Sequence, residues 1–285
     1  ELYSLHSWAK MVRVTRGGGE AMAVAVRIAR AYTKKDIVLF CGYHGWHDWY
    51  LSANLSNKRS LNTHLLSGLD PSGVPANLSG TVIGFEFNNT KEFLSLWSKY
   101  GNRVAAVVME PIRNTPPQQD FLETIRTKTK KANVVLIFDE ITSGWRLCVG
   151  GAHKNLGVNP DMAVFAKAIS NGYPMSAIIG KAEVMDAAQS SFISSTYWTE
   201  RIGPTAALAT IKTLKKDHVP VHLNRIGMMV QEGWQKAASK TKMDIHVGGI
   251  KPLSHFSFDG KDPLLAKTVF TQLMLEKGFL STTAF

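Results

Sequence analysis

Cysteine is scarce in this chain of 285 residues, which contains only Cys41 and Cys148. Two thiols outside any CxxC motif cannot build the disulfide framework of small secreted proteins, so we expect free thiols in a reducing cytoplasm. Long hydrophobic runs are also missing, because no apolar stretch approaches the roughly 20 residues that span a bilayer. The N-terminus lacks the charged and apolar pattern of a signal peptide. These absences argue against a membrane protein.

Acidic residues are fewer than basic ones: 22 Asp and Glu stand against 33 Lys and Arg, which gives a net charge of +11. The basic residues are scattered, and no basic helix is interleaved with aromatic residues, so nucleic-acid binding is not expected. Anionic cofactors and substrates fit this charge but do not follow from it. The chain begins at Glu1 without an initiator methionine, and we expect a fragment or a processed chain.

Hydrophobic residues make up 45% of the chain and charged residues 19%, which is typical of a globular protein with a sizeable core. Continuous apolar runs alternate with segments of helical spacing, which predicts a largely parallel sheet covered by helices on both faces. The predicted strands are 37–40, 81–85, 104–109, 134–138, 162–165 and 176–180, and the predicted helices are 20–33, 90–100, 121–132 and 204–214.

The pattern changes after about residue 215. A helix is predicted over 221–240, short segments over 243–258 and a further helix over 263–277. We therefore expect a large α/β domain over 1–214 and a smaller, incomplete α+β domain over 215–285.

Three chemically reactive side chains follow predicted strands: Glu110, Asp139 and Lys167. In parallel sheets ligands bind beyond the carboxyl ends of the strands, so these residues are expected at one site. A lysine in an apolar context has a lowered pKa and can form a Schiff base with pyridoxal phosphate (PLP), while a carboxylate can keep the pyridine nitrogen protonated. The alternatives are a surface lysine at a helix start for Lys167, and a helix cap or structural ion pair for Asp139.

Glycines precede the first long predicted helix, in the segment Arg16-Gly17-Gly18-Gly19-Glu20. Backbone N–H groups converging at a helix N-terminus favour a phosphate, so Gly18 and Gly19 are candidates for the cofactor phosphate. The alternative is a flexible turn. Tyr43 follows a predicted strand and is a candidate for stacking on the ring, and Ile141 can pack on one face of a planar ring.

A metal site is a weaker interpretation of the next segment. His44, His47 and Asp48 have a spacing that metal ligands use, but no further His/Cys cluster completes the set. We therefore expect no metal.

Together these segments resemble class III aminotransferases, a subgroup of fold-type I PLP enzymes, and most of all their glutamate-1-semialdehyde 2,1-aminomutase-like branch. The resemblance extends from about Trp8 to Phe285. It rests on the ordered set Gly-Gly-Gly-Glu-Ala, Tyr-His-Gly, Glu-Pro, Asp-Glu-Ile-Thr-Ser-Gly-Trp-Arg, Ala-Lys-Ala and Asn-Gly-Tyr-Pro.

This resemblance implies PLP as cofactor, amino-donor and carbonyl-acceptor substrates, and a homodimer with shared active sites. It implies that Lys167 forms the Schiff base and moves protons, and that Asp139 pairs with the pyridine nitrogen. The remaining cofactor contacts that it implies are Gly18, Gly19, Tyr43, His44, Glu110 and Ile141, together with Thr196 or Thr199, one of which reaches the phosphate in the neighbouring subunit.

Two departures accompany the resemblance. Gly17 and Gly19 replace hydroxyl residues of the family's usual turn, so phosphate binding is expected to rest more on the partner chain. Residues 198–203 are longer than the family's usual turn before Pro204, which leaves the phosphate threonine open between Thr196 and Thr199. We also expect the family's N-terminal segment to be missing and the C-terminal domain to be cut short. The leading hypothesis is amino-group transfer or its intramolecular form, an aminomutase reaction. The alternatives are another PLP reaction, such as racemisation, and an inactive protein that only binds cofactor or dimerises.

Overall fold

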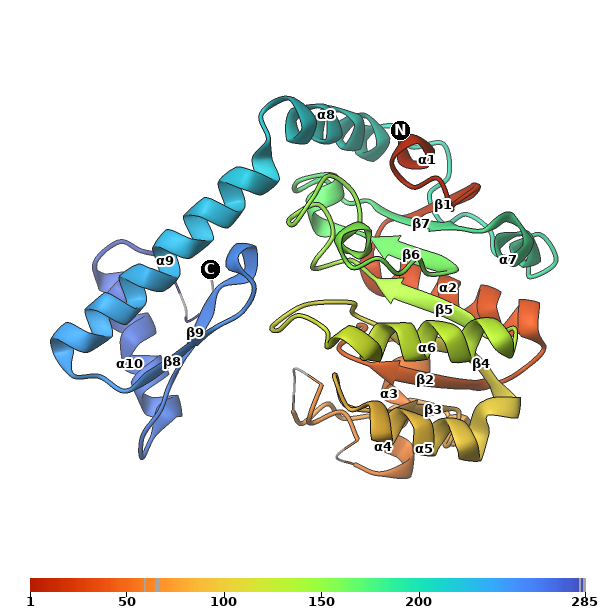
Figure 1. Ribbon diagram of the computed structural model, residues 1–285, viewed down its shortest axis with the longest axis horizontal. Helices are drawn as coiled ribbons and strands as arrows, with labels where there is room; N and C mark the ends of the chain where they lie inside the picture. Colours follow the sequence, from red (N-terminus) through yellow and green to blue (C-terminus); the bar gives the residue numbers. More distant parts are fainter. Residues whose placement is uncertain (59, 65–66, 282, 284–285) are drawn as a thin grey trace.

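A seven-stranded sheet forms the centre of the computed structural model, which describes residues 1–58, 60–64, 67–281 and 283 (Figure 1). The strand order is β1-β7-β6-β5-β4-β2-β3. Strands β3, β2, β4, β5 and β6 are parallel, whereas β7 is antiparallel to both of its neighbours. The prediction of a mostly parallel sheet is therefore confirmed. The strands are β1 (Met11–Thr15), β2 (Ile37–Cys41), β3 (Val82–Gly84), β4 (Val104–Met109), β5 (Val135–Asp139), β6 (Met162–Phe165) and β7 (Ser176–Gly180).

Helices cover both faces of this sheet (Figure 1). Side chains of a strand alternate between the two faces. In β2, Val38 and Phe40 join the hydrophobic cluster of α2, while Leu39 and Cys41 join the cluster on the opposite face. Because both faces are covered, the inner strands are almost entirely apolar, with Asp139 at the end of β5 and Ser176 at the start of β7 as exceptions. The helices are α2 (Gly18–Thr33) on one face and α5 (Thr90–Tyr100), α6 (Gln119–Lys131) and α8 (Ile202–Lys216) on the other.

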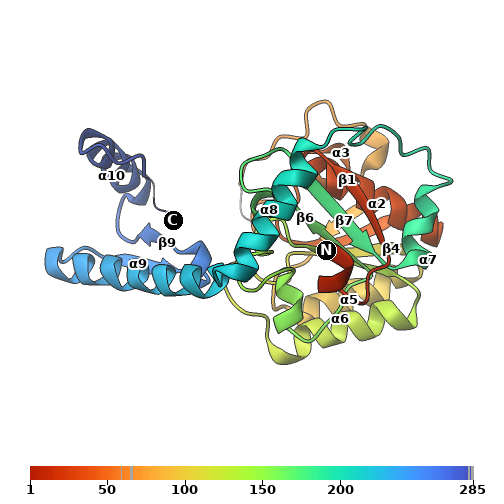
Figure 2. The same cartoon turned by 90° about the horizontal axis from the view of Figure 1, so that it is seen from above.

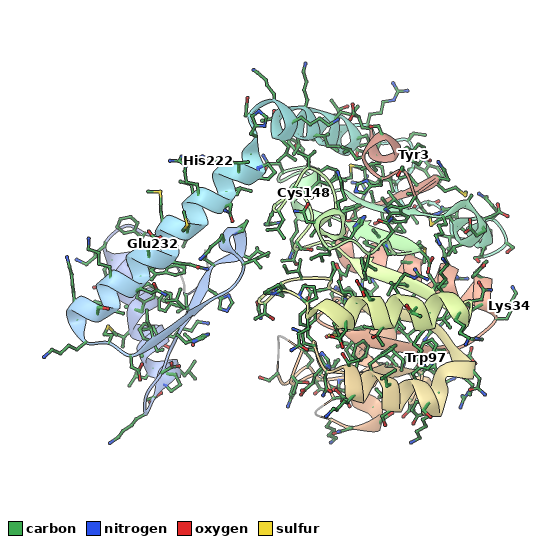
Figure 3. All side chains as sticks on the ribbon, viewed as in Figure 1. Tyr3, Lys34, Trp97, Cys148, His222 and Glu232 are labelled. Carbon is green, nitrogen blue, oxygen red and sulfur yellow. The ribbon has the colours of Figure 1, made fainter. Side chains whose placement is uncertain are left out.

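Different helices lie at the two edges of the sheet. Tyr3 belongs to the short helix α1 (Leu2–Leu5), near β1, and Trp97 belongs to α5, at the β3 side, so the two labels in Figure 3 mark opposite edges of the sheet. The segment 42–80, which was expected to be loop-rich, contains the short helices α3 (Asp48–Leu51) and α4 (Ala53–Ser56). After β7 the chain forms another short helix, α7 (Ala182–Met185).

The C-terminal elements lie beside the large sheet, connected to it through α8 and the long helix α9 (Val219–Thr241) (Figures 1 and 2). Strands β8 (Ile245–Gly248) and β9 (His255–Phe258) form a separate antiparallel pair, followed by α10 (Pro263–Glu276). Aromatic contacts hold this part together, with the rings of Trp234 and Phe256 4.9 Å apart. A domain boundary at residue 215 would fall in the last turn of α8. Among the described residues no helix is long and apolar enough to cross a membrane.

Candidate active site

Three parallel strands, β2, β5 and β6, end beside one pocket. His44 lies just beyond β2, Asp139 ends β5, and Lys167 follows β6 after a single residue. These three residues line a pocket of about 600 Å³ together with the glycine turn before α2 and the segment after β5. Parallel strands carry their carboxyl ends to the same edge of the sheet, and the loops of that edge therefore form the walls.

Asp139 is buried and makes two hydrogen bonds. Its Oδ1 accepts from the Ile141 backbone N–H at 3.0 Å, and its Oδ2 lies 2.8 Å from His44 Nδ1. His44 Nε2 faces the Cys41 carbonyl oxygen at 3.1 Å, so both ring nitrogens of His44 face acceptors. Only a doubly protonated imidazole donates to both, and this arrangement matches a negatively charged Asp139.

Lys167 is half-buried, and its Nζ donates to Thr142 Oγ1 at 2.9 Å. Burial lowers the pKa of the Lys167 amine, and the positive charges of Arg113 and Arg146 lower it further. The backbone of Lys167 has a φ of +51°, a left-handed conformation that is uncommon for a residue with a side chain and often marks a functional site. The negative charges of Asp139 and Glu110 act in the opposite direction, and the net shift is toward the neutral, nucleophilic form of the amine.

The glycine turn forms the N-terminus of α2. Its N-cap, Gly17, has no side chain to cap the helix, so the first backbone N–H groups remain available for a ligand. A Cβ on Gly18 would lie 2.8 Å from Ile141 Cδ1, and a Cβ on Gly19 would lie 2.8 Å from His47 Nδ1. The two glycines therefore allow the helix to approach the segment after β5 and the loop after β2.

Two polar atoms around this pocket are buried and unpaired in the described part of the chain. They are His47 Nδ1, next to Gly19, and Ser176 Oγ, at the start of β7. Buried polar atoms are normally paired, so unpaired ones beside a pocket indicate a missing polar partner. A phosphorylated ligand has the oxygen acceptors that these groups need.

Glu110 is not among the described residues that line this pocket and instead lines a smaller pocket beside the loop after β2. Its Oε2 accepts from the Tyr43 backbone N–H at 3.2 Å, and its Oε1 pairs with Arg113 Nη1 at 2.7 Å. Burial raises the pKa of Glu110, and the nearby charge of Asp139 raises it further, while Arg113 opposes this rise. Tyr43 itself lines the pocket.

The two candidate phosphate threonines lie apart from the pocket of this chain. Thr196 Oγ1 donates to the Val14 carbonyl oxygen at 2.7 Å, and Thr199 is exposed. Neither is among the pocket-lining residues of the described chain. Their predicted contact with a neighbouring subunit stays a prediction.

The metal interpretation finds no support among residues 1–58, 60–64, 67–281 and 283, where no group of three or more His, Cys, Asp or Glu residues is arranged to hold a metal. His44, the first member of the proposed set, is occupied by Asp139.

Three residues near the lysine were not identified from the sequence: Thr142, Arg113 and Arg146. Arg146 Nη1 donates to the Thr142 carbonyl oxygen at 2.9 Å. Arg146 thus fixes the backbone of Thr142, whose hydroxyl accepts from Lys167 Nζ. Thr142 and Arg146 both lie within the motif after Asp139, and Arg113 is three residues after Glu110. Their positions shortly after the ends of β4 and β5 are the sequence feature that could have predicted their place near the site.

The family model for aminotransferase class-III matches residues 3–283. The chain belongs to this family. Among curated class-III relatives, 3-aminobutyryl-CoA aminotransferase of Cloacimonas acidaminovorans is 28% identical over 282 residues, covering 95% of this chain and 64% of that protein. Glutamate-1-semialdehyde 2,1-aminomutase of Natranaerobius thermophilus is 33% identical over 250 residues, covering 85% of this chain and 57% of that protein.

Solved structures give the same fold. An omega-transaminase from Sphaerobacter thermophilus is 25% identical with a TM-score of 0.77, covering 91% of this chain and 62% of that one. The FumI protein of Sphingopyxis sp. MTA144, in its PLP internal aldimine form, is 20% identical with a TM-score of 0.87, covering 99% and 66%. The fold-type I assignment is thereby confirmed, and the chain spans less than two thirds of the length of these relatives.

Proposed function

We propose that this class-III chain acts in PLP-dependent amino-group transfer between an amino donor and a carbonyl acceptor, with Lys167 as the catalytic lysine. The observation that carries the proposal is the shared pocket of Lys167, whose amine has a lowered pKa, and Asp139, which is paired with His44. Relatives named as aminomutases and as an aminotransferase support both the intermolecular and the intramolecular form of the reaction.

The residues around the pocket fit this cofactor. The uncapped N-terminus of α2 at Gly18 and Gly19 would hold the phosphate, and Tyr43 and Ile141 would flank the ring. When bound, PLP supplies an aldehyde for the lysine amine and a ring that accepts electrons. Asp139 would hold a proton on the ring nitrogen, which requires the carboxylate form that His44 supports.

Lys167 would carry out the proton transfer. A neutral amine can remove a proton from the amino-bearing carbon of the donor and return it to the carbon on the other side of the amino nitrogen. The Thr142 hydroxyl, which accepts from Nζ at 2.9 Å, would set the direction of the amine. Glu110 and Arg113 would border the substrate side of the pocket.

A homodimer is part of the proposal. Large aromatic side chains are exposed near the pocket and on the threonine segment: Trp46 at 70%, Trp198 at 78% and Phe192 at 90%. A second copy would cover such surfaces, and Thr196 or Thr199 of one copy would then reach the phosphate of the other. We also place the protein in a reducing cytoplasm, because both cysteines are free.

The Lys167→Ala variant tests the proposal. Purified wild-type protein incubated with PLP is expected to gain a visible absorbance band, and borohydride reduction followed by peptide mass spectrometry is expected to locate the cofactor on Lys167. In Lys167→Ala both signals should be lost. Lys99→Ala, an exposed lysine on α5, serves as the matched control and should keep both.

An absorbance band that is unchanged in Lys167→Ala, or a cofactor located on another lysine, would reject the assignment. The reaction type has its own measurement. Amino-group transfer predicts that an amino donor converts the bound cofactor and that an oxo acid restores it. Racemisation without such a half-reaction would contradict transfer.

A further inference from the structure

Arg113 lies in a second, smaller pocket next to the site. Its Nη1 is 2.7 Å from Glu110 Oε1, and its side chain is 24% exposed whereas that of Glu110 is 8% exposed. The smaller pocket has a volume of about 170 Å³, and its wall contains both members of this ion pair together with Cys41, Gly42, Thr63, His64, Phe87, Asn114 and Thr115. A partly buried guanidinium thus faces a space large enough for a small polar group.

Glu110 connects the two pockets. One of its oxygens binds Arg113, and the other accepts from the backbone of Tyr43, which lines the larger pocket that contains Lys167. A Cβ on Gly42 would lie 2.7 Å from Glu110 Oε2, so the backbone of the loop after β2 touches this carboxylate. The loop after β2, which Glu110 binds, thus contributes Gly42 to the pocket of Arg113 and Tyr43 to the pocket of Lys167.

The charges around Arg113 favour an incoming anion. The charge of Arg113 acts on Lys167, where it disfavours the protonated amine, so the two side chains lie within electrostatic range. The side chain of Arg113 is 24% exposed although Glu110 is buried, so the guanidinium stays accessible from the smaller pocket. Only one of the five N–H groups of Arg113 has a hydrogen bond to Glu110, and a second carboxylate can bind in the fork geometry that guanidinium groups prefer.

We infer that Arg113 determines substrate specificity by binding a carboxylate of the amino donor and acceptor, with Glu110 holding the guanidinium in place until the substrate arrives. The substrates are then amino acids and oxo acids rather than simple amines. This inference rests on the proposed amino-group transfer at Lys167, which it makes more specific.

The test compares donors that differ only in charge. The PLP-loaded protein is mixed with 3-aminobutanoate or 4-aminobutanoate, and with the corresponding neutral amides, while the visible absorbance is followed in single turnover. The wild type is expected to prefer an acid over its amide by about 10- to 100-fold, the range of a charge-assisted hydrogen bond. Arg113→Gln should remove this preference by slowing the acid at least about 10-fold more than the amide, and Arg113→Lys should be intermediate.

Binding without turnover gives an independent measurement. Saturation-transfer NMR with butanoate and butanamide is expected to show preferential butanoate binding that Arg113→Gln abolishes. Arg103→Gln, an exposed arginine at the opposite end of β4, is the matched control and should retain the wild-type preference. Thermal melting and cofactor absorbance verify that each variant folds and binds PLP.

Several outcomes would overturn the inference: equal slowing of acids and amides in Arg113→Gln, a wild type without preference for acids, or butanoate binding that Arg113→Gln leaves unchanged. Failure of the proposed function looks different. In that case no absorbance band forms at Lys167, or the loaded wild type converts neither acids nor amides, whatever the NMR measurement shows for butanoate.

Discussion

Asp139 and Glu140 are consecutive residues, and each pairs with a histidine at 2.8 Å, yet the regions around them differ. Glu140 is fully buried and accepts four hydrogen bonds, from Ser143 Oγ, the backbone N–H groups of Ala152 and His153, and His153 Nδ1. Within the described part of the chain, Asp139 accepts only from Ile141 and His44, and it lines the pocket. Protein donors therefore fill all four acceptor positions of the Glu140 carboxylate, whereas the Asp139 carboxylate can still accept a hydrogen bond from a ligand.

The histidines show the same difference. His153 Nε2 accepts from Trp8 Nε1 at 3.1 Å, so His153 donates from Nδ1 and is a neutral ring. Both nitrogens of His44 face acceptors instead. The comparison indicates that Glu140, whose acceptor positions are filled by the protein, is structural, whereas Asp139 can still accept from a ligand.

The largest expected effect is on activity in Asp139→Asn. An amide cannot hold a proton on the ring nitrogen, so the rate of the amino-donor half-reaction should fall by about 100-fold or more. Stability should change little, because Asn still accepts from Ile141 and donates to a neutral His44. Stopped-flow absorbance and denaturant unfolding measure the two effects. A half-reaction rate in Asp139→Asn equal to that of the wild type would show that Asp139 has no chemical role that Glu140 lacks.

Glu140→Gln should show the opposite pattern. The amide N–H₂ cannot accept hydrogen bonds, so at least one buried donor, such as the Ala152 N–H, loses its partner. We expect a loss of about 3 kcal/mol in the free energy of unfolding, with the half-reaction rate per folded molecule retained. Denaturant unfolding of wild type and variant in parallel checks this. Unchanged stability with lost activity would show that Glu140 has a chemical role.

A smaller effect is expected from His6, which packs against the Glu140 region. His6 Nε2 accepts from the Gly151 N–H at 3.0 Å, and burial lowers the pKa of His6 from 6.5 to about 4. As the pH falls, His6 therefore takes up a proton in the unfolded chain before it does so in the folded chain. The contribution of neutral His6 to stability is complete above pH 6.5 and is lost as the pH falls toward 4. At pH 5 the loss is about 2 kcal/mol.

The matched variant is His6→Gln, which removes the titrating group. Free energies of unfolding measured between pH 7 and pH 4.5 should fall less steeply for His6→Gln than for the wild type. Parallel curves would show that the acid sensitivity arises elsewhere.

Much of the sheet follows from the sequence, because continuous apolar runs are stable only between two layers of helices. Strands β4, β6 and β7 have the predicted bounds. Strand β1 was not predicted, because Arg13 interrupts its apolar residues and its strand conformation depends on pairing with β7, far along the chain. The antiparallel direction of β7 is likewise set by the return of the chain across the sheet.

The candidate site was predictable to the extent that parallel strands place Asp139 and Lys167 at one edge. The contacts that distinguish its residues were not, since the bonds from Lys167 to Thr142, from His44 to Asp139 and from Arg113 to Glu110 depend on side-chain directions. The left-handed backbone of Lys167 is also a property of the folded loop.

The contact between Trp8 and His153 has a practical meaning for protein engineering. His6 and Trp8 reach across the fold to Gly151 and to His153, the partner of Glu140, so this segment does not tolerate changes as an exposed loop would. A protease that removes them would uncover the hydrogen-bonded cluster behind β5. Residues 6–8 should therefore be treated as part of the packed cluster behind β5 when variants are designed.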